Sequence, residues 1–311
     1  MSSDLRDVTD LLEAERARLL PNTSGQVREA ATQHSHLNEE CFALAVMSAD
    51  GELSVTDQAD VEFPLQSVVK PWVYAVALVD HGGEVHTRIG VEPTGEPYDA
   101  VVLEHETGKP PNPMVNAGAL LASALVQGDS VEARVARILE VCSRAAGRDL
   151  SVDEDVAAYE IEHGDRNRAL GYLMRAGGTL PCPVEDALEV LSTACAISVT
   201  AADLATMGGT LATWGRRPGS DEEVLPASVV TEVLSVMATC GMYDGSGGWV
   251  HRAGMPAKSG VSGALLAVAP GVLGLGSFSP PLDEQGNSVR GLAAGVALSG
   301  ALGLHRFAPP A

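Results

Sequence analysis

The chain has 311 residues, of which 45% are hydrophobic and 20% are charged. This composition is typical of a globular protein of one large or two smaller domains, and it excludes an intrinsically disordered chain. With 20 Lys and Arg against 41 Asp and Glu, the formal net charge is −21, so its long-range field disfavours nucleic acids and anionic membranes as partners. The net charge does not exclude a small zwitterionic or anionic substrate that binds in a local site.

The N-terminal part combines helix and strand patterns. Apolar residues at helical spacing predict an amphipathic helix over residues 4–20. The apolar run 41–49 predicts a strand, and residues 52–56 after Asp-Gly predict the second strand of a hairpin. A buried helix is predicted over residues 72–80, where His-Gly-Gly follows.

The rest of the chain is first helical and then sheet-forming. The predicted helices cover residues 116–127, 131–146, 165–175 with Asp165 as N-cap, a segment from Pro183, a segment with a capping box at Thr200 and Asp203, and 228–240. Short apolar runs at 253–258, 264–269 and 272–279 predict antiparallel strands, and a helix over 289–304 ends the pattern.

This order predicts an α+β fold whose antiparallel sheet is built from both chain ends and flanked by helices. Residues 1–83 and 239–311 would form the sheet subdomain, and residues 84–238 a mainly helical inserted subdomain.

Cysteine usage and apolar tracts predict a soluble cytoplasmic protein. The five cysteines contain no C-x-x-C pattern, which favours reduced thiols over a disulfide framework. The first residues lack the apolar stretch of a secretory signal, and no apolar tract reaches the length of a membrane span. We therefore expect no membrane association.

Two motifs contain lysine, of which the sequence has only three. Ser67-Val-Val-Lys70 is an S-x-x-K motif, and Lys258-Ser-Gly is a K-[ST]-G motif. Either alone is weak, but both in this order are rare by chance. The alternative interpretation is one lysine at a helix start and another in a turn. No P-loop, dinucleotide or H-E-x-x-H motif accompanies them, so no cofactor or metal is expected.

The first motif favours acyl-transfer chemistry. Ser67 and Lys70 are three residues apart, so in a helical turn their side chains share one face. Pro71 requires the helix to begin close to Ser67, which leaves the Ser67 N–H available to an oxyanion. Burial and a second cation such as Lys258 would lower the pKa of Lys70 enough for it to act as a base.

With these residues in place, the chain resembles the serine-dependent glutaminases, which share the fold of the serine β-lactamases and penicillin-binding proteins. The resemblance covers about residues 40–300. It rests on the segments Gln66-Ser-Val-Val-Lys-Pro71, Gly90-Val-Glu-Pro-Thr-Gly95, Asn112-Pro-Met-Val-Asn-Ala-Gly118, Gly164-Asp-Arg-Asn167, Cys240-Gly-Met-Tyr-Asp244, Pro256-Ala-Lys-Ser-Gly-Val261 and Ser279-Pro-Pro-Leu-Asp283.

The resemblance implies catalytic roles. Ser67 would be the nucleophile and Lys70 its base. Tyr243 would help to carry the proton to departing ammonia. The Val261 N–H would complete the oxyanion hole with that of Ser67, and Lys258 would support the site electrostatically.

The resemblance also implies a substrate-binding set: Gln66, Asn116, Glu160, Asn167, Tyr243 and Val261. A carboxylate such as Glu160 suits the α-ammonium of glutamine, and amide N–H groups suit its α-carboxylate. Without the resemblance, Glu160 and Asn167 would be read as an exposed helix-end pair, and Asn116 as a helix start.

Two positions depart from the family pattern. Tyrosines that the family places near the substrate fall on Ala30 and Leu191 in this sequence. Each lost hydrogen bond to a charged group would weaken substrate binding about tenfold to a hundredfold. Unless other residues, such as Gln33 or His34, compensate through a different loop arrangement, we expect an enzyme that is weak on glutamine or prefers a related amide.

Three functions are therefore considered. The first is a glutaminase that hydrolyses L-glutamine to L-glutamate and ammonia through a serine acyl-enzyme. The second is a serine–lysine amidohydrolase of the same family with weakened glutamine preference, or one acting on another small amide, an ester or a β-lactam. The third is an inactive amino-acid-binding family member. The resemblance also implies a homo-oligomer, a dimer or tetramer.

Overall fold

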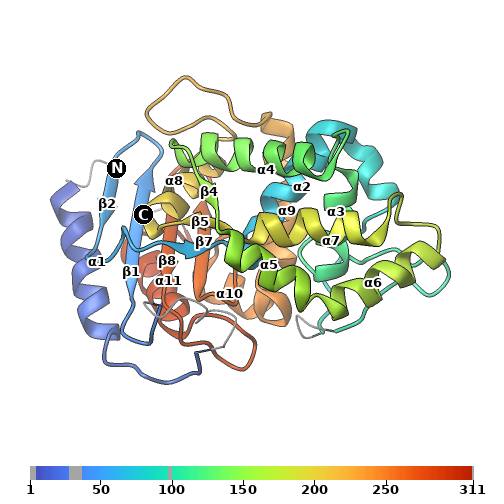
Figure 1. Ribbon diagram of the computed structural model, residues 1–311. Coiled ribbons are helices and arrows are strands. Elements are labelled where there is room, and N and C mark those ends of the chain that lie inside the picture. Colours follow the sequence, from blue (N-terminus) through green and yellow to red (C-terminus); the bar gives the residue numbers. More distant parts are fainter. Residues whose placement is uncertain (1–4, 28–36, 97–99, 310–311) are drawn as a thin grey trace.

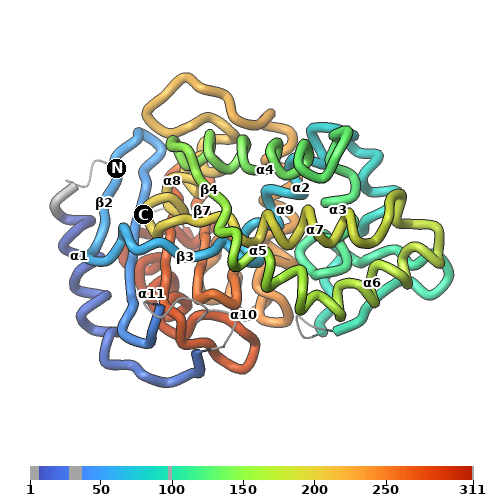
Figure 2. The backbone as a smooth tube through the Cα atoms, viewed as in Figure 1, coloured from blue at the N-terminus to red at the C-terminus, as the bar shows by residue number. Residues whose placement is uncertain are grey.

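The computed structural model describes residues 5–27, 37–96 and 100–309. Its main sheet has five strands in the order β2-β1-β8-β7-β6, and every neighbouring pair is antiparallel. The strands are β1 (Ala43–Ser48), β2 (Leu53–Val55), β6 (Ala257–Ser259), β7 (Ala264–Ala269) and β8 (Leu273–Phe278). Because β1 pairs with β8 along its whole length, a strand from the N-terminal part of the chain lies beside one from the C-terminal part, as the neighbouring blue and red segments in Figure 2 show. The predicted sheet from both chain ends is confirmed.

The sheet lies between two helical layers. Alternate residues of β1 face opposite sides, so Leu44 and Val46 join one apolar core while Ala45 and Met47 join the other. The first core contains side chains of α1 (Leu5–Leu19), α10 (Ser246–Ala253) and α11 (Val289–Ala301). The second includes α8 (Ala201–Ala212), which approaches β8 so closely that a Cβ on Gly274 would lie 2.1 Å from the Gly209 nitrogen.

The remaining helices lie on the other side of the molecule from α1 (Figure 1). They are α2 (Lys70–His81), α3 (Asn116–Leu125), α4 (Val131–Ala146), α5 (Glu154–Glu162), α6 (Asp165–Ala176), α7 (Val184–Cys195) and α9 (Ala227–Cys240). The described chain also contains the short 3-10 helices η2 (Gln66–Val69), η3 (Gly82–Thr87) and η4 (Tyr243–Gly245). No helix in the described part of the chain is long and apolar enough to cross a membrane.

Several local predictions can be compared with these elements. The capping box is confirmed, since the Asp203 N–H donates to Thr200 Oγ1 and the Thr200 N–H donates to Asp203 Oδ2. The strand predicted over 253–258 is wrong in its first half, because Ala253 ends α10. Asp165 is the first residue of α6 rather than its N-cap, which is Gly164. The proposed subdomain boundary after residue 238 falls inside α9, and the division into two subdomains stays a prediction.

A second, three-stranded sheet fixes the segment that precedes η2. It consists of β3 (Phe63–Pro64), β5 (Ile197–Val199) and β4 (Ser151–Val152), in that order. The Phe63 ring also stacks on that of Phe278 in β8, with ring centroids 3.9 Å apart. The chain therefore enters η2 from a position held by both sheets.

Candidate active site

Ser67 lies in η2, directly after a residue with an unusual backbone conformation. The preceding residue, Gln66, has a φ of 48°, a left-handed conformation that is uncommon for a side chain of this size. The helix then continues as α2, whose early Pro71 occupies a position where a missing N–H costs little. Ser67 and Lys70 line the same cavity of about 230 Å³.

Lys70 is buried, with 2% of its surface exposed. Its Nζ donates a hydrogen bond of 2.6 Å to Asn116 Oδ1. Burial lowers the pKa of Lys70 to about 8, because the charged amine loses its hydration. With a pKa of about 8, about a tenth of the amine is neutral at pH 7 and able to accept a proton.

Asn116 is positioned by a turn that packs tightly against the first turn of α3. Asn112 Oδ1 accepts hydrogen bonds from the backbone N–H groups of Met114 and Val115. A Cβ on Gly118 would lie 1.9 Å from the Asn112 carbonyl oxygen, so only glycine fits there. The Asn-Pro-Met-Val-Asn-Ala-Gly segment thus directs Asn116 toward Lys70.

Helices α5 and α6 contribute a carboxylate and an amide to one wall of the cavity. Glu160 Oε1 accepts a 3.0 Å hydrogen bond from Gln66 Nε2, and burial raises the pKa of the Glu160 carboxyl. Asn167, in the first turn of α6, also lines the cavity. Its Oδ1 is buried and has no hydrogen-bond partner among the described residues. Glu160 and Asn167 are therefore not an exposed helix-end pair.

Lys258 and Tyr243 form a buried group that does not itself line this cavity. Lys258 is fully buried, and its Nζ donates to the Ser259 carbonyl oxygen at 2.6 Å and lies 4.0 Å from the centre of the Tyr243 ring. The Tyr243 hydroxyl donates to the same carbonyl at 3.3 Å. Burial, followed by the charge of Lys70, lowers the pKa of Lys258 well below its usual value.

Val261 reaches the cavity from the turn between β6 and β7. The Gly260 N–H donates to the Ala264 carbonyl, and Gly263 closes the turn with a φ of 97°. A Cβ on Gly263 would lie 2.3 Å from the Ser279 carbonyl oxygen, so this turn also depends on glycine. The turn places Val261 in the same cavity as Ser67.

Helix α7 supplies three wall residues, Leu191, Ser192 and Cys195. Leu191 was singled out as a departure from the family pattern, but Ser192 and Cys195 were missed because their helical spacing is equally typical of an ordinary core face. Burial raises the pKa of the Cys195 thiol to about 12, so it is uncharged. Ala30, Gln33 and His34 lie outside the described residues.

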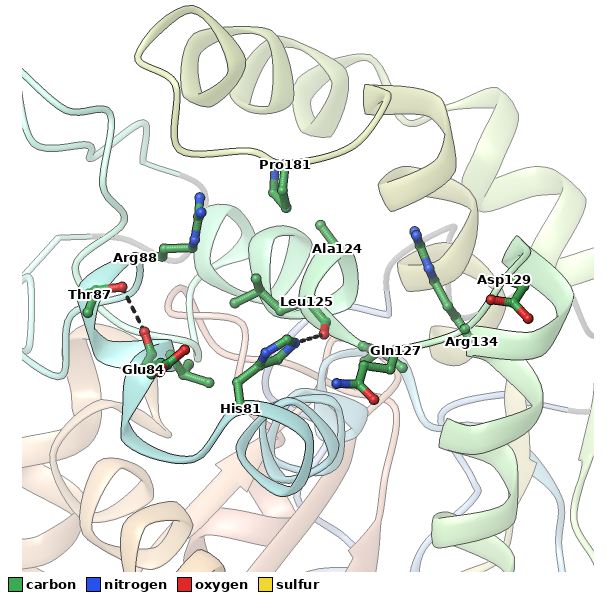
Figure 3. A pocket seen from close by; sticks show the side chains of 13 residues that line it. His81, Glu84, Thr87, Arg88, Ala124, Leu125, Gln127, Asp129, Arg134 and Pro181 are labelled. Carbon is green, nitrogen blue, oxygen red and sulfur yellow. Dashed lines mark hydrogen bonds between the residues drawn. The ribbon is translucent and has the colours of Figure 1, made fainter.

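A second, larger cavity of about 680 Å³ lies between the end of α2, η3 and the α3–α4 connection (Figure 3). Here His81 Nε2 is hydrogen-bonded to the Leu125 carbonyl oxygen at 2.7 Å, and Arg88 Nη1 donates to the Thr179 carbonyl at 2.9 Å. Among the described residues, it shares no wall residue with the cavity of Ser67. It brings none of the predicted site residues together.

Comparison with known proteins identifies the family of the chain. The glutaminase family model matches residues 25–307. The glutaminase of Clavibacter michiganensis subsp. michiganensis is 49% identical over 91% of this chain and 87% of its own, and that of Microcystis aeruginosa is 41% identical over 91% and 84%.

Solved structures show the same fold. A probable glutaminase, YbaS, superimposes with a TM-score of 0.94 at 34% identity, covering 99% of this chain and 100% of the other. Mglu in its glutamate form gives 0.92 at 39% identity, covering 98% and 71%. These matches confirm the predicted family and its β-lactamase-like α+β fold. The chain belongs to the glutaminase family.

Proposed function

We propose that the protein hydrolyses L-glutamine to L-glutamate and ammonia through a glutamyl ester of Ser67. One observation supports this most directly: a serine hydroxyl and a buried lysine with a lowered pKa share a small cavity with a half-buried carboxylate whose pKa is raised. The hydroxyl and amine suit amide hydrolysis, and the carboxylate suits the ammonium of an amino acid.

The reaction begins with the neutral form of Lys70. Lys70 Nζ takes the Ser67 proton while Ser67 Oγ bonds to the side-chain carbonyl carbon of glutamine. The backbone N–H groups of Ser67 and Val261 hold the oxyanion of the tetrahedral intermediate. The carbon–nitrogen bond then breaks, and the proton held by Lys70 passes through Tyr243 to the departing nitrogen, so that ammonia leaves and Lys70 is neutral again. Lys70 next takes a proton from a water molecule while the water oxygen bonds to the ester carbon. The bond to Ser67 Oγ breaks, the proton returns from Lys70 to Ser67 Oγ, and glutamate is released.

The substrate head lies at the other side of the cavity. The Glu160 carboxylate binds the α-ammonium and is held in place by Gln66. Asn116 and Asn167 contribute the amide groups that complete the head-group site. Lys258 contacts the Tyr243 ring and donates to the Ser259 carbonyl oxygen, and so holds both in position behind the cavity.

The test is ammonia release from glutamine by the wild-type protein and by Ser67→Ala. We expect Ser67→Ala to lower kcat by at least about 10⁴-fold, because the covalent route is lost. Ser235→Ala, which changes an exposed serine on α9, serves as the control and should retain wild-type activity. Equal rates for wild type and Ser67→Ala would exclude this mechanism.

A weaker preference for glutamine is the second candidate function. It is favoured by Leu191, which lines the cavity where the family resemblance would place a tyrosine. Values of kcat/KM for glutamine, asparagine and a chromogenic β-lactam distinguish the two candidates. Binding of glutamine without turnover would instead support the inactive amino-acid-binding protein. A cytoplasmic location and a homo-oligomer stay predictions.

A further inference from the structure

Ser192 is a buried residue in the wall of the cavity. The residue is 3% exposed and lines the cavity together with Cys195, one helical turn further along α7. No other described residue forms a hydrogen bond with its side chain, whereas the buried Ser123 of α3 donates to the Ala119 carbonyl at 3.0 Å. The Ser192 oxygen keeps accessible surface, unlike the fully buried unpartnered oxygens of Ser262 and Ser277, so its hydroxyl is free to bond to a ligand in the cavity.

The surrounding polar groups indicate which part of a ligand it would meet. Glu160 and the unpartnered Asn167 Oδ1 are acceptors, which suit the α-ammonium of an amino acid. The α-carboxylate needs donors instead. Lys70 is the only cation among the described residues that line the cavity, and its Nζ already donates to Asn116 Oδ1.

The carboxylate therefore depends on uncharged donors. Because Asn116 accepts with its oxygen, its Nδ2 group is left as a donor. The Ser192 hydroxyl is a second such donor, on a different helix. Two donors from different helices match the two oxygens of a carboxylate.

We propose that Ser192 is a specificity-determining residue that donates a hydrogen bond to the α-carboxylate of the bound substrate. This inference rests on the proposed function, and it adds a requirement for a free α-carboxylate. An amino-acid amide whose α-carboxylate is blocked would lose the interaction, because a neutral carbonyl is a weaker acceptor than a carboxylate.

The experiment compares L-glutamine with its α-amide, following hydrolysis of the side-chain amide by chromatography of the products. We expect Ser192→Ala to raise KM for glutamine about tenfold with kcat within about twofold. The KM for the α-amide should change by less than about threefold, since a neutral partner contributes less. The preference for glutamine over its α-amide should therefore fall.

Two further variants separate binding from packing. Ser192→Thr retains a hydroxyl and should recover most of the preference, and Ser123→Ala removes a buried hydroxyl outside the cavity and should leave it unchanged. An unchanged KM for glutamine in Ser192→Ala, or an equal rise for both substrates, would overturn the proposal. Absence of ammonia release by the wild-type protein is a separate outcome, which would refute the proposed function itself.

Discussion

The two cavities differ in size and in how their charged groups are arranged. The cavity of Figure 3 is about three times larger in volume, at about 680 Å³ against 230 Å³, yet His81 and Arg88 in its wall are bonded to backbone carbonyls. In the smaller cavity, Lys70 is buried and its pKa is lowered, while the Glu160 pKa is raised. Acid–base catalysis at neutral pH needs side chains whose pKa values the protein has shifted. Buried ionisable groups therefore identify the active site better than cavity volume does.

The sharpest test of this difference removes the buried amine. Lys70→Met should lower kcat/KM by about 10³- to 10⁴-fold, because Ser67 loses its base. Lys109→Met is the matched control, since Lys109 Nζ donates to the His86 carbonyl away from Ser67. We expect it to keep wild-type activity in the same ammonia-release assay. Similar activity in the two variants would remove the distinction between these lysines.

The same substitution should stabilise the fold. Below about pH 8, Lys70 is protonated in both the folded and the unfolded chain, and the folded state bears the full cost of the buried charge. Between about pH 8 and its unfolded value of 10.5, the unfolded chain binds more protons, so the wild type gains stability as pH rises. At pH 7, Lys70→Met should raise the free energy of unfolding by about 1–3 kcal/mol in urea denaturation.

The pH dependence of catalysis gives the next largest effect. If neutral Lys70 is the base, kcat/KM should rise about tenfold per pH unit and level off above its pKa of about 8. The increase from about pH 6 to about pH 9 should be about 90-fold, and an acid-side contribution from Glu160 would act in the same direction. A flat profile across this range would contradict the assignment of Lys70 as the base.

The catalytic pair Ser67 and Lys70 could be predicted from one short segment of sequence, but the substrate-binding residues could not. The spacing of Ser67 and Lys70 and the following Pro71 are properties of one helical turn, so the sequence alone indicates a reactive pair. Glu160 and Asn167 come from separate helices, and only tertiary packing brings them to Gln66 and Asn116. Their assignment therefore depended on the resemblance.

For the fold too, features that extend over one long segment could be predicted, and features that depend on tertiary packing could not. Helices with strong periodicity were predicted well, and the segment 131–146 matches α4. The two-residue strands β3 and β4 are too short for any alternation to be seen. Ser192 and Cys195 have the spacing of a buried face, and no sequence pattern distinguishes a face that meets a core from one that meets a cavity.

A matched pair of carboxylate substitutions completes the comparison of the two cavities. Glu160→Gln preserves shape and one acceptor oxygen but removes the charge that pairs with the α-ammonium, so KM for glutamine should rise at least about tenfold. Glu84→Gln makes the same change in the wall of the larger cavity, where the side chain is exposed, and KM should stay within about twofold. Steady-state kinetics on both variants measure the difference. If Glu84→Gln raised KM more than Glu160→Gln does, the larger cavity would take part in substrate binding. An exposed carboxylate that does not contact the substrate should not change KM by that much.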